Sequence, residues 1–231
     1  RDARYANYRF LPEMLSSGLL STAQAEAIFA YRETHGGELC GTTRFADWLD
    51  DWPAMDMGLA HLDHGRRLAA QRLFVGHVAC HHAAGHGTVY EQCTIRPGAS
   101  GAREPKAGFC VPAELVAPRL LRHLLVHETP ERLWLNPAGL CRWLAEPFSA
   151  HGVPTRFGTV SFDLQAEDDE TTTAHVDLGE VQPGTVVSLR LPRVDGRPVA
   201  AVAAEDGARC EGDTAVLAPR RKPYVLHTLR A

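Results

Sequence analysis

The sequence lacks several features that mark particular classes of protein. It has no run of about 18 or more apolar residues, as a membrane-spanning helix requires, and no apolar signal-peptide core near its N-terminus. It also has no basic stripe, since 24 basic residues stand against 28 acidic ones and the net charge is -4. A chain without clustered Lys and Arg is not expected to bind nucleic acid or an anionic membrane surface, and small neutral or polar ligands fit it better.

Short paired cysteine spacings are absent as well. The six cysteines are scattered, which argues against a disulfide framework and against a two-cysteine zinc knuckle. We therefore expect reduced thiols in a cytoplasmic protein, and no motif predicts a cofactor. The sequence begins with Arg1 rather than Met, so we expect a processed product, a shortened form or the tail of a longer protein.

The residues before about 147 show helical periodicity. Ser21 and Gln24 have the spacing of a capping box, and the apolar residues that follow recur every three or four positions, which predicts a helix over 21–35. Gly58 and Gly65 are candidate breaks, and Pro118 indicates a kink or a helix start. We predict a loop over 85–108 and further helices over 43–53, 55–84 and 111–130.

Beyond Pro147 the apolar residues alternate with polar ones, which is typical of strands. Val160, Phe162 and Leu164 run toward an acidic turn, and the alternation resumes after it, so the segment predicts a β-hairpin. Further short apolar segments follow, separated by turn residues. We predict an α+β chain, with a helical domain over 1–146 and a small antiparallel β-sandwich over 147–231.

Histidines are concentrated between Gly76 and Cys93. His77 and His81 stand four residues apart, so on a helix they share one face, and with His86 they could supply three ligands to a metal ion. The glutamate that follows the first histidine in the zinc-peptidase motif is replaced by Val78. The alternative is that the histidines are ordinary residues of a helix and its C-terminal end.

Glu91 follows the histidines, between Tyr90 and Gln92. A carboxylate held near a cleft can act as the general base for a water molecule if a carboxylic acid faces it across the bond to be cut. A lone loop glutamate is otherwise exposed to solvent.

A resemblance adds to this local interpretation. The order of "GTVYEQ", the apolar segment "FCVPAELVAPRLLRHLLV" and the β module resembles the end of a six-hairpin (α/α)6 glycosidase, the class that includes the α-L-rhamnosidases. The resemblance implies a carbohydrate ligand and implies that Glu91 is the general base of an inverting hydrolysis. Segments such as "PTRFGTVSFDL" also resemble bacterial proteins of this barrel class.

The resemblance implies an incomplete barrel. Twelve helices do not fit into the residues before Pro147, so the chain would be the C-terminal part of such a protein, without its general acid. It would expose an apolar helical face and require a missing N-terminal segment, a partner chain or self-association.

Other polar and aromatic residues could contact a sugar. We predict this role for Tyr90, Trp48, Asp51, Arg44 and Glu38, although core packing and turn capping explain several of them equally well. Two alternatives to a glycosidase remain. One is a noncatalytic carbohydrate-binding or interaction module, and the other is a metal-dependent hydrolase that uses His77, His81 and His86.

Overall fold

The structure, a computed structural model, describes residues 9–45, 47–82, 88–97, 103–140, 146–204 and 208–229. The chain is α+β and divides into two compact units, Arg1–Arg122 (unit 1) and His123–Ala231 (unit 2). The boundary predicted after residue 146 differs from this division, because β6 (Val126–Thr129) and β7 (Arg132–Leu135) join a sheet of unit 2. Each unit is described by itself.

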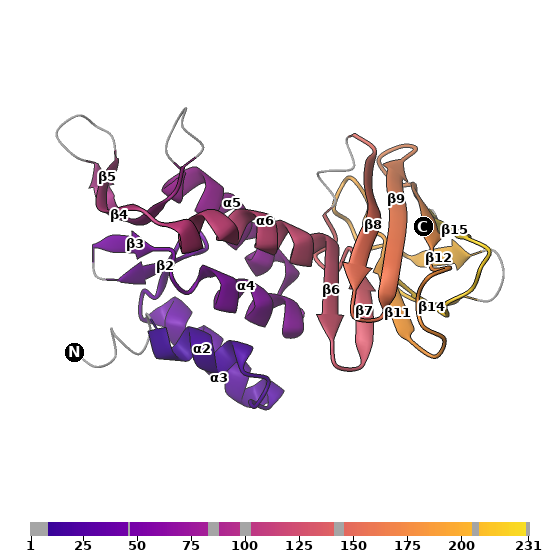
Figure 1. The fold of residues 1–231 in the computed structure, drawn as a ribbon, viewed down its shortest axis with the longest axis horizontal. Coiled ribbons are helices and arrows are strands. Elements are labelled where there is room, and N and C mark those ends of the chain that lie inside the picture. The colour runs from indigo at the N-terminus through magenta and orange to yellow at the C-terminus, as the bar shows by residue number, and fades with distance from the viewer. Residues whose placement is uncertain are drawn as a thin grey trace. The chain divides into compact units, whose positions relative to one another are not determined.

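The helices lie in unit 1, except that the last residues of α6 extend beyond it. They are α2 (Leu11–Ser16), α3 (Thr22–Thr34), α4 (Ala54–Asp63), α5 (Arg67–His81) and α6 (Val111–Leu125), drawn in Figure 1. The capping box of α3 is confirmed, since the Ser21 amide donates to Gln24 Oε1 at 2.9 Å and the Gln24 amide donates to Ser21 Oγ at 3.4 Å. Of the two predicted breaks, Gly65, at φ +70°, separates α4 from α5, whereas Gly58 lies inside α4.

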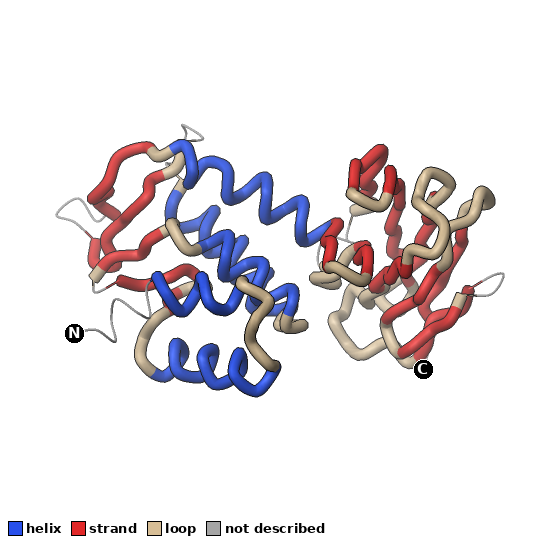
Figure 2. The backbone as a smooth tube through the Cα atoms, turned by 60° about the horizontal axis from the view of Figure 1, so that its bottom comes forward, coloured by secondary structure: helices blue, strands red, loops and turns tan. Residues whose placement is uncertain are grey.

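Unit 1 also contains a five-stranded antiparallel sheet, which the sequence analysis did not predict. Its strands follow the order β1 (Glu38–Leu39), β2 (Thr42–Phe45), β3 (Trp48–Asp50), β4 (Tyr90–Pro97) and β5 (Arg103–Phe109). The predictions of a helix over 43–53 and of a loop over 85–108 are therefore wrong. Hydrogen bonds between β3 and β4 join segments that are distant in sequence, and local periodicity does not reveal such pairing. In both views this sheet lies at one end of the helices of unit 1 (Figures 1 and 2).

Helix α5 lies very close to the turn between β1 and β2. A Cβ atom at Gly76 would stand 1.8 Å from the Cys40 carbonyl oxygen, and one at Gly41 would stand 2.6 Å from the Arg72 carbonyl carbon. Gly41 also has φ +77°, which glycine adopts at little cost. Only glycine fits both positions, and their contact fixes where His77 lies.

Unit 2 consists of two five-stranded sheets. One has the order β12 (Ala201–Ala204), β15 (Tyr224–Leu229), β10 (Thr172–Asp177), β9 (Gly158–Ala166) and β8 (Phe148–Thr155). The other has the order β13 (Arg209–Glu211), β14 (Thr214–Leu217), β11 (Val186–Arg190), β7 and β6. The β9–β10 hairpin is confirmed, with Phe162 opposite Val176. The described strands within the predicted range 147–231 pair with one another only in antiparallel fashion, as expected, and the one parallel pairing, of β11 with β7, involves a strand that precedes this range.

Both sheets contribute to one hydrophobic core. Leu133 and Leu189 from one sheet and Phe162 and Leu226 from the other belong to the same cluster, and each is at most 1% exposed. Burial of these side chains is the main favourable contribution to folding of unit 2.

The described helices include none that is both long enough and apolar enough to cross a membrane.

Candidate functional site

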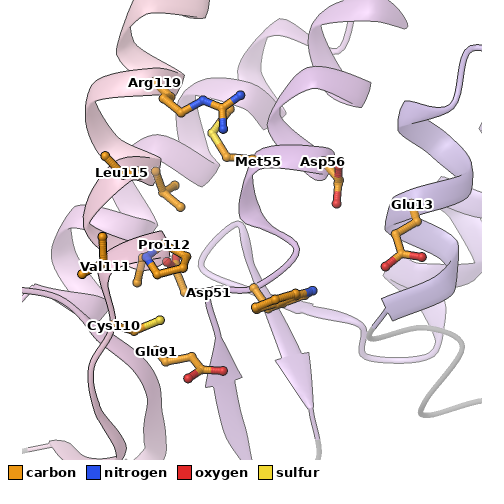
Figure 3. A pocket seen from close by; sticks show the side chains of 13 residues that line it. Glu13, Asp51, Met55, Asp56, Glu91, Cys110, Val111, Pro112, Leu115 and Arg119 are labelled. Atoms are coloured by element: carbon orange, nitrogen blue, oxygen red, sulfur yellow. The ribbon is translucent and has the colours of Figure 1, made fainter.

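A cavity of about 400 Å³ lies in unit 1, where β3 ends and β4 begins, near α2, α4 and the start of α6 (Figure 3). We call it the carboxylate cavity, because four of its lining residues are acidic. Its lining consists of Glu13, Asp51, Trp52, Met55, Asp56, Glu91, Cys110, Val111, Pro112, Ala113, Leu115, Val116 and Arg119. A volume of this size accommodates a small ligand such as one sugar residue.

Glu91 lies at one end of the carboxylate cavity, on β4, and Arg119 lies at the other (Figure 3). The Glu91 side chain is half-buried, and its carboxylate has no hydrogen-bond partner among the described residues. Its backbone carbonyl accepts a hydrogen bond of 2.9 Å from the Asp51 amide. The strand thus holds the backbone of Glu91 in place while its carboxylate remains available to a ligand or a water molecule.

Asp56 is a second carboxyl group in the same cavity, in the first turn of α4. Its Oδ1 accepts a hydrogen bond of 3.2 Å from the Ser16 hydroxyl. Burial raises the pKa of Asp56 above its ordinary value, and the nearby Glu13 charge adds to the rise, while the Ser16 hydrogen bond and Arg119 oppose it. A carboxyl group with a raised pKa retains its proton to higher pH and can donate it.

The remaining lining is mainly apolar, with one exposed aromatic ring. Trp52 is 47% exposed, and the Arg9 guanidinium lies 5.1 Å from its ring centroid. Leu115 and Val111, from the start of α6, are 51% and 67% exposed. An indole ring beside carboxylates and a guanidinium suits a ligand that has both apolar faces and hydroxyl groups.

Asp51 lies in the wall of the carboxylate cavity, where it is 2% exposed. Its Oδ1 stands 2.5 Å from Nδ1 of His77, a fully buried residue of α5. His77 Nε2 in turn stands 3.3 Å from Nε2 of the half-buried His82. Burial lowers the pKa of His82, and His77 lowers it further, while Asp51 opposes the shift.

The other predicted sugar contacts lie outside the carboxylate cavity as the structure describes it. Tyr90 and Trp48 are half-buried residues of the sheet, and the Arg44 amide donates to the Gly37 carbonyl at 2.9 Å. Glu38 forms an ion pair with the buried Arg32 at 3.5 Å. Burial raises the pKa of Glu38, while Arg32 opposes the shift. The structure therefore brings together Glu91 and Asp51 but not the other four.

Two of the three predicted histidine ligands lie within the described residues, and each is hydrogen-bonded to another residue through Nδ1. His77 Nδ1 is engaged by Asp51, and His81 Nδ1 donates to the Tyr90 carbonyl at 3.0 Å. His86 lies outside the described residues. Across the part of the chain that the structure describes, no group of three or more His, Cys, Asp or Glu side chains is arranged to hold a metal ion.

The charged or thiol-bearing lining residues that the sequence did not single out are four: Asp56, Glu13, Arg119 and Cys110. Asp56 stands in the first turn of a helix, where an acidic residue is ordinary, so nothing local distinguishes it. Its position opposite Glu91 arises from the tertiary fold. The nearby segment "DDWP" did carry information about the cavity in the sequence, since its Asp51 and Trp52 line the cavity.

Comparisons with known proteins give one distant structural similarity to report. No protein-family model matches the sequence, and no curated protein matches it. Among solved structures, a GH127 β-arabinofuranosidase is similar, with a TM-score of 0.43 and 11% sequence identity. The match covers 83% of this chain and 33% of that enzyme, so the chain spans about one third of the enzyme's length.

Proposed function

We propose that the chain is part of a glycosidase-like protein, that the carboxylate cavity binds a sugar residue, and that Glu91 and Asp56 act there as general base and general acid. One observation carries the proposal. A carboxylate that has no partner among the described residues and a carboxyl group whose pKa is raised line the same cavity. Two carboxyl groups whose environments differ in this way are what acid–base hydrolysis of a glycoside requires.

In the proposed reaction one carboxyl group donates a proton and the other accepts one. Asp56 gives its proton to the glycosidic oxygen as the bond from that oxygen to the anomeric carbon breaks. Glu91 accepts a proton from a water molecule whose oxygen forms the new bond to the same carbon. The products are a free sugar of inverted configuration and an alcohol. Asp56 ends ionised and Glu91 ends protonated, and solvent restores both.

The other lining residues contribute binding. The exposed Trp52 ring offers a face for the sugar ring, and the Arg119 guanidinium can donate hydrogen bonds to sugar hydroxyl groups. Asp56 thereby supplies the acid that the resemblance placed in a missing segment.

The five described helices are fewer than the twelve of an (α/α)6 toroid, and the sheet of unit 1 interrupts them. In the proposal unit 1 is part of a barrel and unit 2 is the β-sandwich that follows it. A missing N-terminal segment, a partner chain or a second copy would complete the barrel. The described cysteines are all free, which agrees with a cytoplasmic location.

The test combines binding and turnover. The chain is mixed with a panel of aryl glycosides and free sugars, and hydrolysis and calorimetric binding are measured for the wild type, Glu91→Gln and Asp56→Asn. We expect each substitution to lower kcat by about 10²–10⁴-fold while sugar binding persists. Glu114→Gln is the matched control, because Glu114 is a half-buried glutamate of α6 outside the cavity lining.

The pH profile provides a second check. Activity should decline at high pH as Asp56 loses its proton, and Asp56→Asn should remove that decline together with most of the rate. Binding without hydrolysis by the wild type would instead identify a noncatalytic carbohydrate-binding module. The proposal would be refuted if the wild type neither bound nor hydrolysed any member of the panel.

A further inference from the structure

Asp51 occupies an unusual position for a residue expected to contact a sugar. It lies in the wall of the carboxylate cavity, but its Oδ1 is engaged by His77 and its Oδ2 is buried without a hydrogen-bond partner among the described residues. Burying a carboxylate in this way costs free energy, because water would solvate both oxygens. The fold therefore retains a costly group beside the candidate acid and base.

The backbone of Asp51 connects to both of those groups. Its amide donates to the Glu91 carbonyl at 2.9 Å, which ties Glu91 on β4 to the end of β3. Its carbonyl accepts a hydrogen bond of 3.0 Å from the amide of Ala54, the first residue of α4. Asp56 follows two residues later in the first turn of that helix. One residue thus links the backbones that carry the two carboxyl groups.

The side chain of Asp51 is fixed from the opposite direction, by α5. An ionised carboxylate only accepts hydrogen bonds, so His77 Nδ1 carries the proton and donates it. In a neutral imidazole Nε2 is then the acceptor, so His77 Nε2 accepts a hydrogen bond of 3.3 Å from the Nε2–H of His82. The neighbouring Gly76 is packed against the Cys40 carbonyl, a close contact that holds this part of α5 against the turn between β1 and β2.

We infer that Asp51 is a positioning residue which, held by the His82–His77 hydrogen-bond chain, fixes the separation of Glu91 and Asp56. The inference rests on the proposed function for the roles of those two carboxyl groups. It departs from the sugar contact predicted for Asp51, since no atom of the side chain is required to touch the ligand. Misplacing a catalytic group by about 1 Å can lower the rate about 10²-fold, so loss of the positioning by Asp51 should have a measurable effect on kcat.

The kinetic test compares Asp51→Ala, Asp51→Asn and the control Asp47→Ala. Asp47 is an exposed residue just before β3. Asp51→Asn keeps an oxygen acceptor for His77, whereas Asp51→Ala removes it. We expect kcat to fall about 10²-fold in Asp51→Ala with KM within about threefold of the wild type, and most of kcat to return in Asp51→Asn. The Asp47→Ala control should match the wild type.

Three outcomes would overturn the inference. A rise in KM in both Asp51 variants would indicate a sugar contact. An equal loss of kcat in Asn and Ala would indicate that the carboxylate acts directly. A loss of kcat no larger than the unfolded fraction would indicate a structural role alone.

A second experiment, by NMR spectroscopy, tests the inference without measuring activity. Proton NMR should show a far-downfield resonance from His77 Nδ1–H, because an imidazole N–H that donates to a buried carboxylate is strongly deshielded. Asp51→Ala should abolish it and shift the carboxyl carbon signals of Glu91 and Asp56. Should Asp51→Ala not fold, His82→Ala replaces it and should move the same signals. Unmoved Glu91 and Asp56 signals would overturn the inference, whereas moved signals without hydrolysis would support it and count only against the proposed function.

Discussion

His61 is a buried titratable side chain of α4 that the proposed reaction does not use. It is 2% exposed, its ring stacks on Phe29 with centroids 5.1 Å apart, and its Nδ1 has no hydrogen-bond partner among the described residues. Burial lowers its pKa from 6.5 to about 3, and the positive charges of Arg66 and Arg32 add to the shift. We predict that His61 makes unit 1 sensitive to acid.

The direction and the magnitude of the change in the free energy of unfolding follow from the pKa of His61 in the unfolded and in the folded chain. The unfolded chain binds a proton at His61 near pH 6.5, whereas the folded chain does so only near pH 3. Acidification therefore favours the unfolded state, and the free energy of unfolding falls by about 1.4 kcal/mol per pH unit below 6.5. Between about pH 7 and about pH 4.5 the loss from this one group is about 2.5 kcal/mol.

The assay is urea unfolding followed by far-ultraviolet circular dichroism, which reports mainly on unit 1 because α2–α5 lie there. The wild type and His61→Gln are compared at both pH values, and His151→Gln, an exposed histidine of unit 2, is the control. Glutamine does not titrate, so His61→Gln should lose about 2.5 kcal/mol less than the wild type on acidification. Equal losses in the wild type and His61→Gln would refute the reasoning.

Three other substitutions test the packing that supports the site and the two units. Gly76→Ala should destabilise unit 1 by about 3 kcal/mol or more in the same urea assay, because its methyl group would overlap the Cys40 carbonyl; normal stability would contradict that contact. Ser21→Ala should cost about 1 kcal/mol by removing the acceptor for the Gln24 amide, and fraying of α3 seen by hydrogen exchange would locate the loss. Phe162→Ala should destabilise unit 2 by about 3–5 kcal/mol in thermal unfolding, and a smaller effect would mean that the surrounding core collapses into the space.

The elements that could be predicted from the sequence are those specified by nearby residues. The capping pair Ser21 and Gln24 marks the start of α3, and strict alternation marks the β9–β10 hairpin. The hairpin of β2 and β3 was predicted as a helix, since Phe45, Trp48 and Leu49 fit a helical spacing as well as two short strands. Tertiary pairing with β4 decides between them, and it involves residues about 45 positions later.

In the candidate site, too, only the features specified by nearby residues could be predicted from the sequence. Glu91 and Asp51 could be selected because an acidic residue beside an aromatic one is an informative local combination. Asp56 could not, because its raised pKa comes from burial and from Glu13, both consequences of the packing of α2 beside α4. Glu38 was predicted to contact a sugar, yet its partner is Arg32, which is fully buried in α3.

The parallel pairing of β7 with β11 has a consequence during synthesis. The β6–β7 hairpin is local and can form as soon as its residues are synthesised. The other edge of β7 stays unpaired until β11 is made, and Val186, the first residue of β11, is synthesised 51 positions after Leu135. At about 5–20 residues per second a ribosome needs about 3–10 s to supply them. For that interval an apolar strand edge bearing Leu133 is open to other nascent chains, so slow translation or high expression should promote aggregation through this strand.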